Sequence, residues 1–191
     1  MISKSNDLTT STAKAQLYGG LVFLVCAPLL AWPFYQFWNF SMRAVIHLGA
    51  NSIVPFILAT FVGIIMHELI HGCTAIWYGG IRRQDAKFGM QWQTLTPYFH
   101  CTVPLTVQKY RWVVIMPLLV LGVLPYGIAL FTGNRGLTVF GILFILATAG
   151  DLVILWLMRH LRADELVQDH PTKIGLTVVR DESINAPISA I

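Results

Sequence analysis

The chain has 191 residues, of which 55% are hydrophobic and only 12% are charged, and its net charge is +4. Soluble globular domains carry roughly twice that share of charged residues, so the composition indicates an integral membrane protein and argues against a soluble domain. The basic residues stand at the ends of apolar runs and form no basic and aromatic patch, which argues against nucleic acid as a partner. The three cysteines, Cys26, Cys73 and Cys101, have neither disulfide-framework nor zinc-knuckle spacing and are interpreted as structural thiols.

Four apolar stretches are long enough to cross a bilayer. A polar tail, residues 1–14, precedes them; we expect it to be disordered, and we see no cleavable signal peptide. A second polar tail, residues 159–191, follows them and contains one predicted strand at residues 173–179. The predicted fold is therefore an all-α polytopic membrane protein with a single membrane-embedded domain, residues 15–158. Its predicted spans cover about residues 17–38, 51–78, 112–132 and 137–158.

The second stretch contains His67-Glu68-Leu69-Ile70-His71, an H-E-x-x-H motif. On a helix the two histidines lie one turn apart on the same face, so both imidazoles can bind one Zn²⁺. Glu68 beside them can act as general base on a metal-bound water. No Asp, Glu, Lys or Arg occurs in residues 44–66 or 69–81. Because a carboxylate and two imidazoles are costly in such surroundings unless they bind something, we predict an intramembrane metal site and disfavour a chance string.

The connection between the second and third stretches, residues 79–111, does not have the pattern of a span. Gly79-Gly80 ends the preceding helix, and residues 87–93 and 98–107 are short, aromatic and rich in Thr and Val. These features predict a β-hairpin at the membrane face. His100 is interpreted as a strand residue, with a metal or substrate contact as the less favoured alternative, and His47 as a loop histidine at the interface.

The fourth stretch carries a single acidic residue, Asp151. Eleven of the 13 Lys and Arg residues fall on one side of the membrane if both termini are cytoplasmic, so the positive-inside rule predicts that orientation. His71 and Asp151 then each lie eight residues before the cytoplasmic end of their spans, so that both are about 12 Å from that boundary. A catalytic zinc needs three protein ligands, and we predict Asp151 as the third. The alternative is a structural carboxylate bonded to a neighbouring hydroxyl. Gly150 beside it is expected to permit close helix approach.

The order of these elements resembles the catalytic core of site-2-protease-type intramembrane metalloproteases. Four segments resemble more closely a family of small bacterial membrane proteins regarded as zincin peptidases, over about residues 50–180. This resemblance implies that His67, His71 and Asp151 bind zinc and that Glu68 activates water. It also implies that an unwound substrate segment pairs with an edge strand within residues 96–107. The chain departs from site-2 proteases in having Ile70 where those have Gly, and in lacking their Asn-Pro and Leu-Asp-Gly signature. The four segments are His67 to Gly72, Tyr98 to Tyr110, Gly150-Asp151 and Asp169-His170-Pro171.

These observations support a zinc-dependent intramembrane endopeptidase, which hydrolyses membrane protein substrates near the cytoplasmic face of the cell (inner) membrane. Its partners would be the lipid bilayer and a transmembrane protein or peptide substrate, with no signal for an oligomeric state. Tyr98 and His100 are candidate substrate contacts, and these two and Asn134 are candidate oxyanion donors. The alternative is a non-proteolytic membrane protein with a structural or sensory metal site. A transporter is disfavoured because the sequence has no internal repeat.

Overall fold

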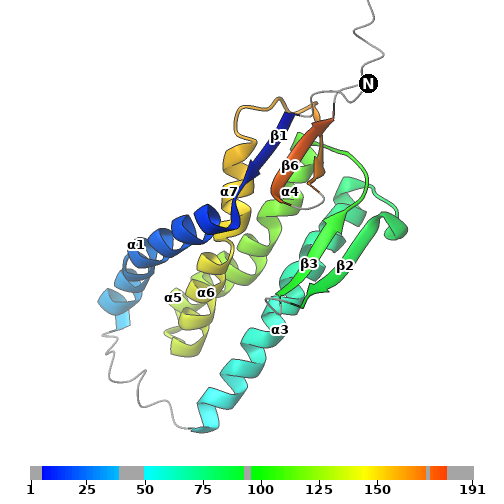
Figure 1. The fold of residues 1–191 in the computed structure, drawn as a ribbon. Coiled ribbons are helices and arrows are strands. Elements are labelled where there is room, and N and C mark those ends of the chain that lie inside the picture. Colours follow the sequence, from blue (N-terminus) through cyan, green and yellow to red (C-terminus); the bar gives the residue numbers. More distant parts are fainter. Residues whose placement is uncertain (1–5, 39–49, 93–95, 171–172, 180–191) are drawn as a thin grey trace, which may run out of the picture.

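Four apolar helical segments form a bundle that carries two small sheets at one end (Figure 1). The computed structural model describes residues 6–38, 50–92, 96–170 and 173–179. Within these ranges, the four predicted spans are confirmed as helices long and apolar enough to cross a membrane, as in a multi-pass membrane protein. They run over Leu17–Trp38, Ile53–Gly79, Val107–Thr132 and Arg135–Leu157.

The third span begins five residues earlier than predicted, because two basic residues lie inside the helix. Lys109 Nζ donates to the carbonyl of Gly79, and Arg111 donates to the carbonyls of Met158 and Leu161. Both cations thus cap the carboxyl ends of neighbouring helices, where unpaired carbonyls attract positive charge. A charge count along the sequence assigns such residues to a connection, although the helix continues through them.

Two of the spans change helix type along their length. The second consists of α3 (Ala50–Thr74) and a π-helical segment, η1 (Ala75–Gly79). The third consists of α4 (Val107–Pro117), a π-helical segment, η3 (Leu118–Val123), and α5 (Leu124–Thr132). The change after Pro117 follows from the lack of an N–H group in proline. The other helices are α1 (Thr12–Trp38), α6 (Arg135–Ala147) and α7 (Ala149–Leu157), the last two forming the fourth span.

The predicted hairpin is confirmed between the second and third spans. After a 3₁₀ turn, η2 (Arg83–Asp85), strands β2 (Ala86–Gln91) and β3 (Thr96–Cys101) pair antiparallel, with Phe88 opposite Phe99. The second strand is shorter than predicted, since the chain leaves the hairpin after Cys101 and soon enters α4. The hairpin lies along one end of α3 (Figure 1).

The two polar tails meet in a second, four-stranded sheet. β1 (Asn6–Thr10) pairs antiparallel with β6 (Ile174–Val179), and the strand order is β1-β6-β5-β4, with β5 (Leu166–Asp169) and β4 (Leu105–Thr106). The strand predicted near residues 173–179 is confirmed, but the prediction of a disordered amino-terminal tail is wrong for Asn6–Thr10. A single five-residue strand gives little signal in a sequence, because its partner lies at the other end of the chain.

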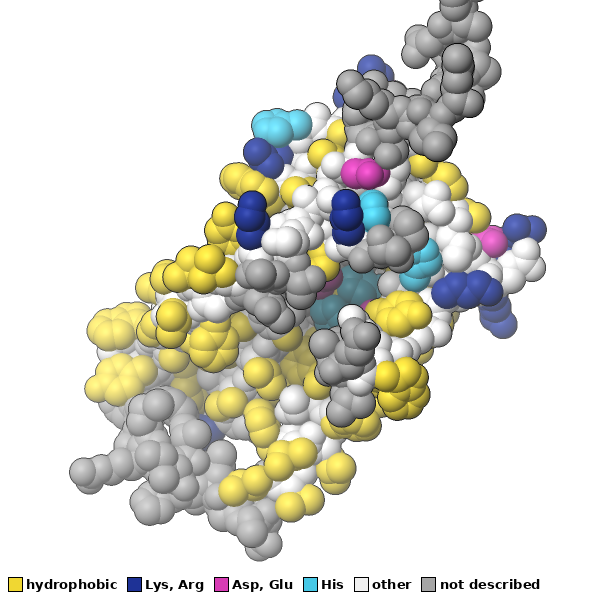
Figure 2. Space-filling model, in the orientation of Figure 1, with side chains coloured by type: hydrophobic (Ala, Val, Ile, Leu, Met, Phe, Trp, Pro, Cys, Tyr) yellow, Lys and Arg dark blue, Asp and Glu magenta, His cyan; other side chains and the backbone are white. Residues whose placement is uncertain are grey.

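The main buried core lies where the four-stranded sheet meets the helix ends, so this end of the bundle is the most firmly packed. On the face shown in Figure 2, hydrophobic side chains predominate in the half away from the sheets, whereas Lys and Arg side chains gather near the sheets. Large apolar side chains stay exposed along α1 and α3, as expected for surfaces that lipid covers. The core includes Val107, Tyr110, Val113, Met158, Val167 and Leu176.

Candidate metal centre

Three side chains from two spans converge on one point beside the hairpin. His67 Nε2 lies 3.2 Å from Asp151 Oδ2, and His71 Nε2 lies 3.5 Å from Asp151 Oδ1. The two histidine Nε2 atoms are 3.2 Å apart. Asp151 therefore lies level with the histidine pair, as the helix rise predicts, and these three residues form a group that could hold a metal ion.

The three side chains are close enough together to offer one ligand atom each to a single ion, since such atoms all lie within 4.8 Å of one another. The contact between the two histidines and their contacts to the two oxygens of Asp151 are near the separation of about 3.3–3.6 Å between ligand atoms of a tetrahedral zinc. Asp151 Oδ2 is buried and, within the described part of the chain, has no hydrogen bond of normal geometry, although His67 Nε2 is 3.2 Å away. A buried carboxylate oxygen without a donor is costly, so the donor set suits a cation between the three side chains.

A hydrogen bond from the second ring nitrogen of His71 fixes the tautomer and the orientation of the imidazole ring. His71 Nδ1 lies 2.8 Å from the carbonyl oxygen of Val113 on α4. Since a carbonyl only accepts, Nδ1 must carry the proton, and Nε2 then offers its lone pair toward His67 and Asp151. This is the tautomer that a metal ligand requires.

Close packing of α3 against α6 brings the ligands together. A Cβ atom placed on Gly63 would lie 2.3 Å from Cζ of Phe144, a side chain that is 2% exposed. Gly63 lies one turn before His67, so the absent side chain allows the approach beside the site. The expectation that Gly150 has this role is wrong, since a Cβ there would meet nothing within 4 Å.

Glu68 reaches the same site from α3 and is held by the hairpin. The backbone N–H of Phe99 donates to Glu68 Oε2 over 2.7 Å. Glu68, His71 and Asp151 line one cavity of about 140 Å³. Figure 2 shows a hollow near the sheets with histidine and acidic side chains inside it. The half-buried carboxylate of Glu68 thus lies beside the metal group and within reach of a small substrate group.

A third acidic residue at this cavity, Asp169 on β5, was not predicted from the sequence. Its carboxylate accepts from the Tyr110 hydroxyl and from the backbone N–H of Cys101 (2.7 Å), and it lies 3.6 Å from His100 Nδ1. Burial raises the pKa of Asp169, against the opposing effect of these donors. The only sequence signal was the Asp169-His170-Pro171 string, which carried a resemblance but no assigned chemistry.

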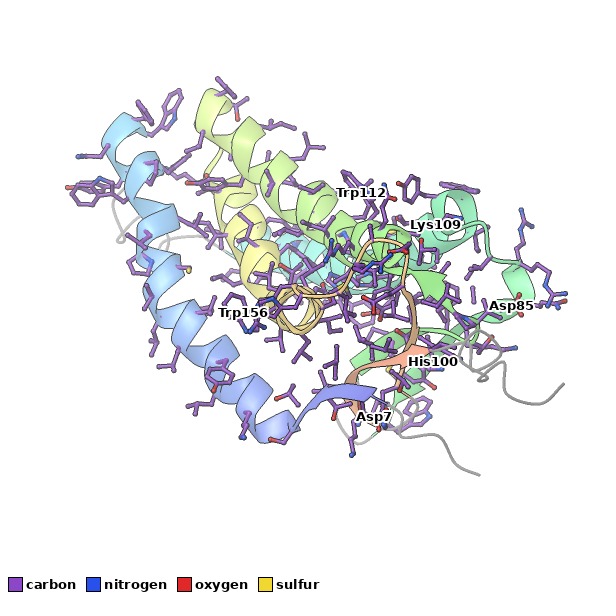
Figure 3. The ribbon with its side chains drawn as sticks, turned by 90° about the horizontal axis from the view of Figure 1, so that it is seen from above. Asp7, Asp85, His100, Lys109, Trp112 and Trp156 are labelled. Carbon is purple, nitrogen blue, oxygen red and sulfur yellow. The ribbon has the colours of Figure 1, made fainter. Side chains whose placement is uncertain are left out.

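Neither Tyr98 nor His100 is among the side chains that line this cavity. Tyr98 is 47% exposed and stands opposite Gly89, where an added Cβ would lie 2.4 Å from the Tyr98 hydroxyl oxygen. His100 pairs with Asp169 and lies on the same side of the molecule as Asp7 in Figure 3.

Another candidate site residue, Asn134, and the cysteine of the hairpin, Cys101, are not among the residues that line the cavity. Asn134 is not an oxyanion donor for this site, because it caps α6 and accepts from the N–H of Leu137 at the other end of the fourth span. His47 lies outside the described residues. Cys101 is buried and its Sγ lies 3.2 Å from the carbonyl of Val103; burial raises the pKa of its thiol, which disfavours the nucleophilic thiolate.

A family model described as "Putative zincin peptidase" (DUF3267) matches residues 60–166. The chain belongs to this family. The matched region contains His67, Glu68, His71 and Asp151 and ends before Asp169. Membership of a zincin family implies zinc as the metal, and the chemistry of the three ligands agrees with that. Comparisons with curated proteins and with solved structures give no match.

Proposed function

We propose that this member of the zincin family is a zinc-dependent intramembrane endopeptidase. His67, His71 and Asp151 would hold the ion, and Glu68 would be the general base. The observation that carries the proposal is the convergence of His67, His71 and Asp151 on one point, with the Glu68 carboxylate lining the adjoining cavity.

In the reaction, water adds to a peptide carbonyl carbon and the bond from that carbon to nitrogen breaks. Bound zinc would supply Lewis acidity for this step. Glu68 accepts the proton of the attacking water and delivers it to the leaving amine nitrogen. The N–H of Phe99, 2.7 Å from Oε2, holds the Glu68 carboxylate toward the cavity. His67, His71 and Asp151 are the three protein ligands typical of a catalytic zinc, which would keep the ion accessible to water or substrate.

The edge of β3 that faces the cavity supports an extended substrate. The N–H groups of Phe99 and Cys101 point away from β2 and donate to carboxylates, those of Glu68 and Asp169. A substrate strand that pairs with this edge would offer carbonyl groups to the same two donors, which hold Glu68 and Asp169 in the substrate-free protein, so pairing would displace these carboxylates from the N–H groups. Because a transmembrane helix must unwind before its peptide bonds become accessible, such pairing would stabilise the unwound segment.

The charge distribution supports an orientation with both termini and the hairpin in the cytoplasm. Eleven of the 13 Lys and Arg residues lie on that side, including Arg82, Lys87 and Lys109 of the second connection. The protein would then be a multi-pass protein of the cell (inner) membrane that cuts its membrane protein substrates near the cytoplasmic face.

The test compares detergent-purified wild type, Glu68→Gln and Glu165→Gln on a library of peptides derived from membrane proteins. New amino termini are identified by mass spectrometry, and zinc content is measured on the same samples. Glu68→Gln is expected to keep its zinc and to lose about 10²–10⁴-fold in cleavage rate, because only the proton transfer is removed. Glu165→Gln, the matched change on the polar tail, should behave as wild type.

Equal cleavage by Glu68→Gln and wild type would refute the proposed mechanism. The alternative, a non-proteolytic protein with a structural metal, predicts a different pattern. Wild type would contain zinc without cleaving any peptide, and His67→Ala would lose its fold together with its metal.

A further inference from the structure

The bond between His71 and α4 needs an acceptor that helices seldom provide. His71 Nδ1 lies 2.8 Å from the main-chain oxygen of Val113, which is in the interior of α4. In a regular α-helix that oxygen accepts the N–H of the residue four positions later. One lone pair of the oxygen is then used by the helix, and a donor from a neighbouring helix must share the oxygen with that N–H.

The residue four positions after Val113 is Pro117. Proline has no N–H, and its ring presses against the carbonyl of the residue four positions earlier. The next N–H, that of Leu118, donates to the carbonyl of Ile115 and not to Val113. The Val113 carbonyl is therefore free of its helical donor.

We propose that Pro117 is a positioning residue for the metal centre. By leaving the Val113 carbonyl without its helical partner, it supplies the acceptor that holds the proton of His71 on Nδ1. The Nε2 lone pair is then directed at His67 and Asp151. This inference rests on the metal site of the proposed function, and it adds a residue of the third span.

Because both groups are buried, the Val113 carbonyl and the His71 ring N–H each depend on the other as a hydrogen-bond partner. His71 is 8% exposed and Val113 is 2% exposed, so solvent water has little access to replace either partner. A buried carbonyl without a donor and a buried imidazole N–H without an acceptor are both costly, and the single bond satisfies both groups. A bond from the far ring nitrogen of a histidine to a carbonyl fixes the tautomer and ring orientation of that histidine as a metal ligand.

The chain offers a matched control in Pro125, which lies in the same span. Pro125→Ala restores an N–H to the same helical span, but its helical acceptor would be the carbonyl of Leu121, eight residues beyond Val113. Pro117→Ala and Pro117→Ser both restore an N–H that competes for the Val113 carbonyl. Alanine and serine are compatible with helix interiors, so these variants should fold.

The experiment has two readouts. The first is the ¹⁵N chemical shift of the His71 ring in metal-free protein at alkaline pH, assigned with His71→Gln, which reports the nitrogen that carries the proton. We expect the Nδ1–H tautomer in wild type and Pro125→Ala, and a mixture in both Pro117 variants. The second is zinc affinity by competition with a chelator. It should fall about 10- to 100-fold in the Pro117 variants and stay at the wild-type value in Pro125→Ala.

Pro117 variants that keep the wild-type tautomer and affinity would overturn the inference, as would a wild-type His71 protonated on Nε2. A different result would refute the proposed function. If wild type binds no zinc, the metal site is refuted, and the tautomer measurement on metal-free protein still decides the role of Pro117.

Discussion

The contact between Gly63 and Phe144 gives the sharpest prediction, because it sets the spacing between α3, which carries His67 and His71, and α6, which is followed in the same span by α7 with Asp151. In Gly63→Ala the new Cβ would lie 2.3 Å from Phe144 Cζ, about 1 Å short of ordinary van der Waals contact. The Phe144 ring is 2% exposed and packs on Phe140 at a centroid distance of 4.6 Å, so it has little room to move. We expect α3 and α6 to separate instead.

The size of the expected loss in zinc affinity follows from the cost of overpacking and from the small ligand displacement that a metal site tolerates. Overpacking by one methyl group costs about 1–3 kcal/mol, and metal sites tolerate ligand displacements of about 0.2 Å. The metal-free protein can relieve the strain by separating the helices, whereas the zinc-bound protein must draw His67 and Asp151 together again. If the whole strain returns on binding, zinc affinity falls about 5- to 160-fold.

The assay is zinc competition with a chelator, together with thermal unfolding of the metal-free protein. Gly150→Ala is the matched control, since it lies next to Asp151 but its Cβ would meet nothing within 4 Å. It should bind zinc as wild type and gain up to about 1 kcal/mol from helix propensity. Wild-type affinity in Gly63→Ala would refute the argument that this contact sets the ligand spacing. An equal loss in both variants would point to helix propensity or backbone effects in place of packing.

Three further predictions concern the ligands, the carboxyl-terminal acid and the topology. Asp151→Ala and His67→Ala should both lose the zinc that wild type carries, by mass spectrometry of purified protein, and zinc retained in Asp151→Ala would refute Asp151 as a ligand. Because burial raises the pKa of Asp169, its neutral form favours the fold; this stabilisation is complete below the ordinary carboxyl pKa and is lost as pH rises through the raised pKa. Asp169→Asn should therefore flatten the fall of melting temperature with rising pH, and parallel curves for the two proteins would contradict this. Single cysteines added at either terminus should be labelled by a membrane-impermeant reagent only after cells are opened, and labelling of intact cells would contradict the orientation.

The sequence predicted most of what depends on local pattern. Apolar run length identified the four spans, and the H-E-x-x-H motif identified His67, Glu68 and His71 as a group. The constant rise of a helix placed Asp151 level with the histidines, and the structure confirms this with contacts of 3.2 and 3.5 Å. Gly79-Gly80 and the aromatic segments after it predicted the hairpin, because turn chemistry and strand composition are short-range properties.

The sequence did not predict the contacts that hold the site in position. Asp169 lies in a tail without periodicity, and it reaches Tyr110 and Cys101 only because β5 is paired in a sheet whose edge strand comes from the other end of the chain. Gly150 was expected to permit helix approach and Gly63 was not, since sequence does not say which face of a lipid-exposed helix meets its neighbour.

The sequence by itself thus determined the chemistry available and its position along the helices, because hydrophobicity and helical rise act along one dimension. Only the tertiary structure decided which partners complete that chemistry. The Val113 carbonyl is 42 residues from His71, and Phe99 is 31 residues from Glu68. Such bonds depend on the rotation and spacing of whole elements, which are set by side-chain volumes at helix crossings such as that of Gly63 with Phe144.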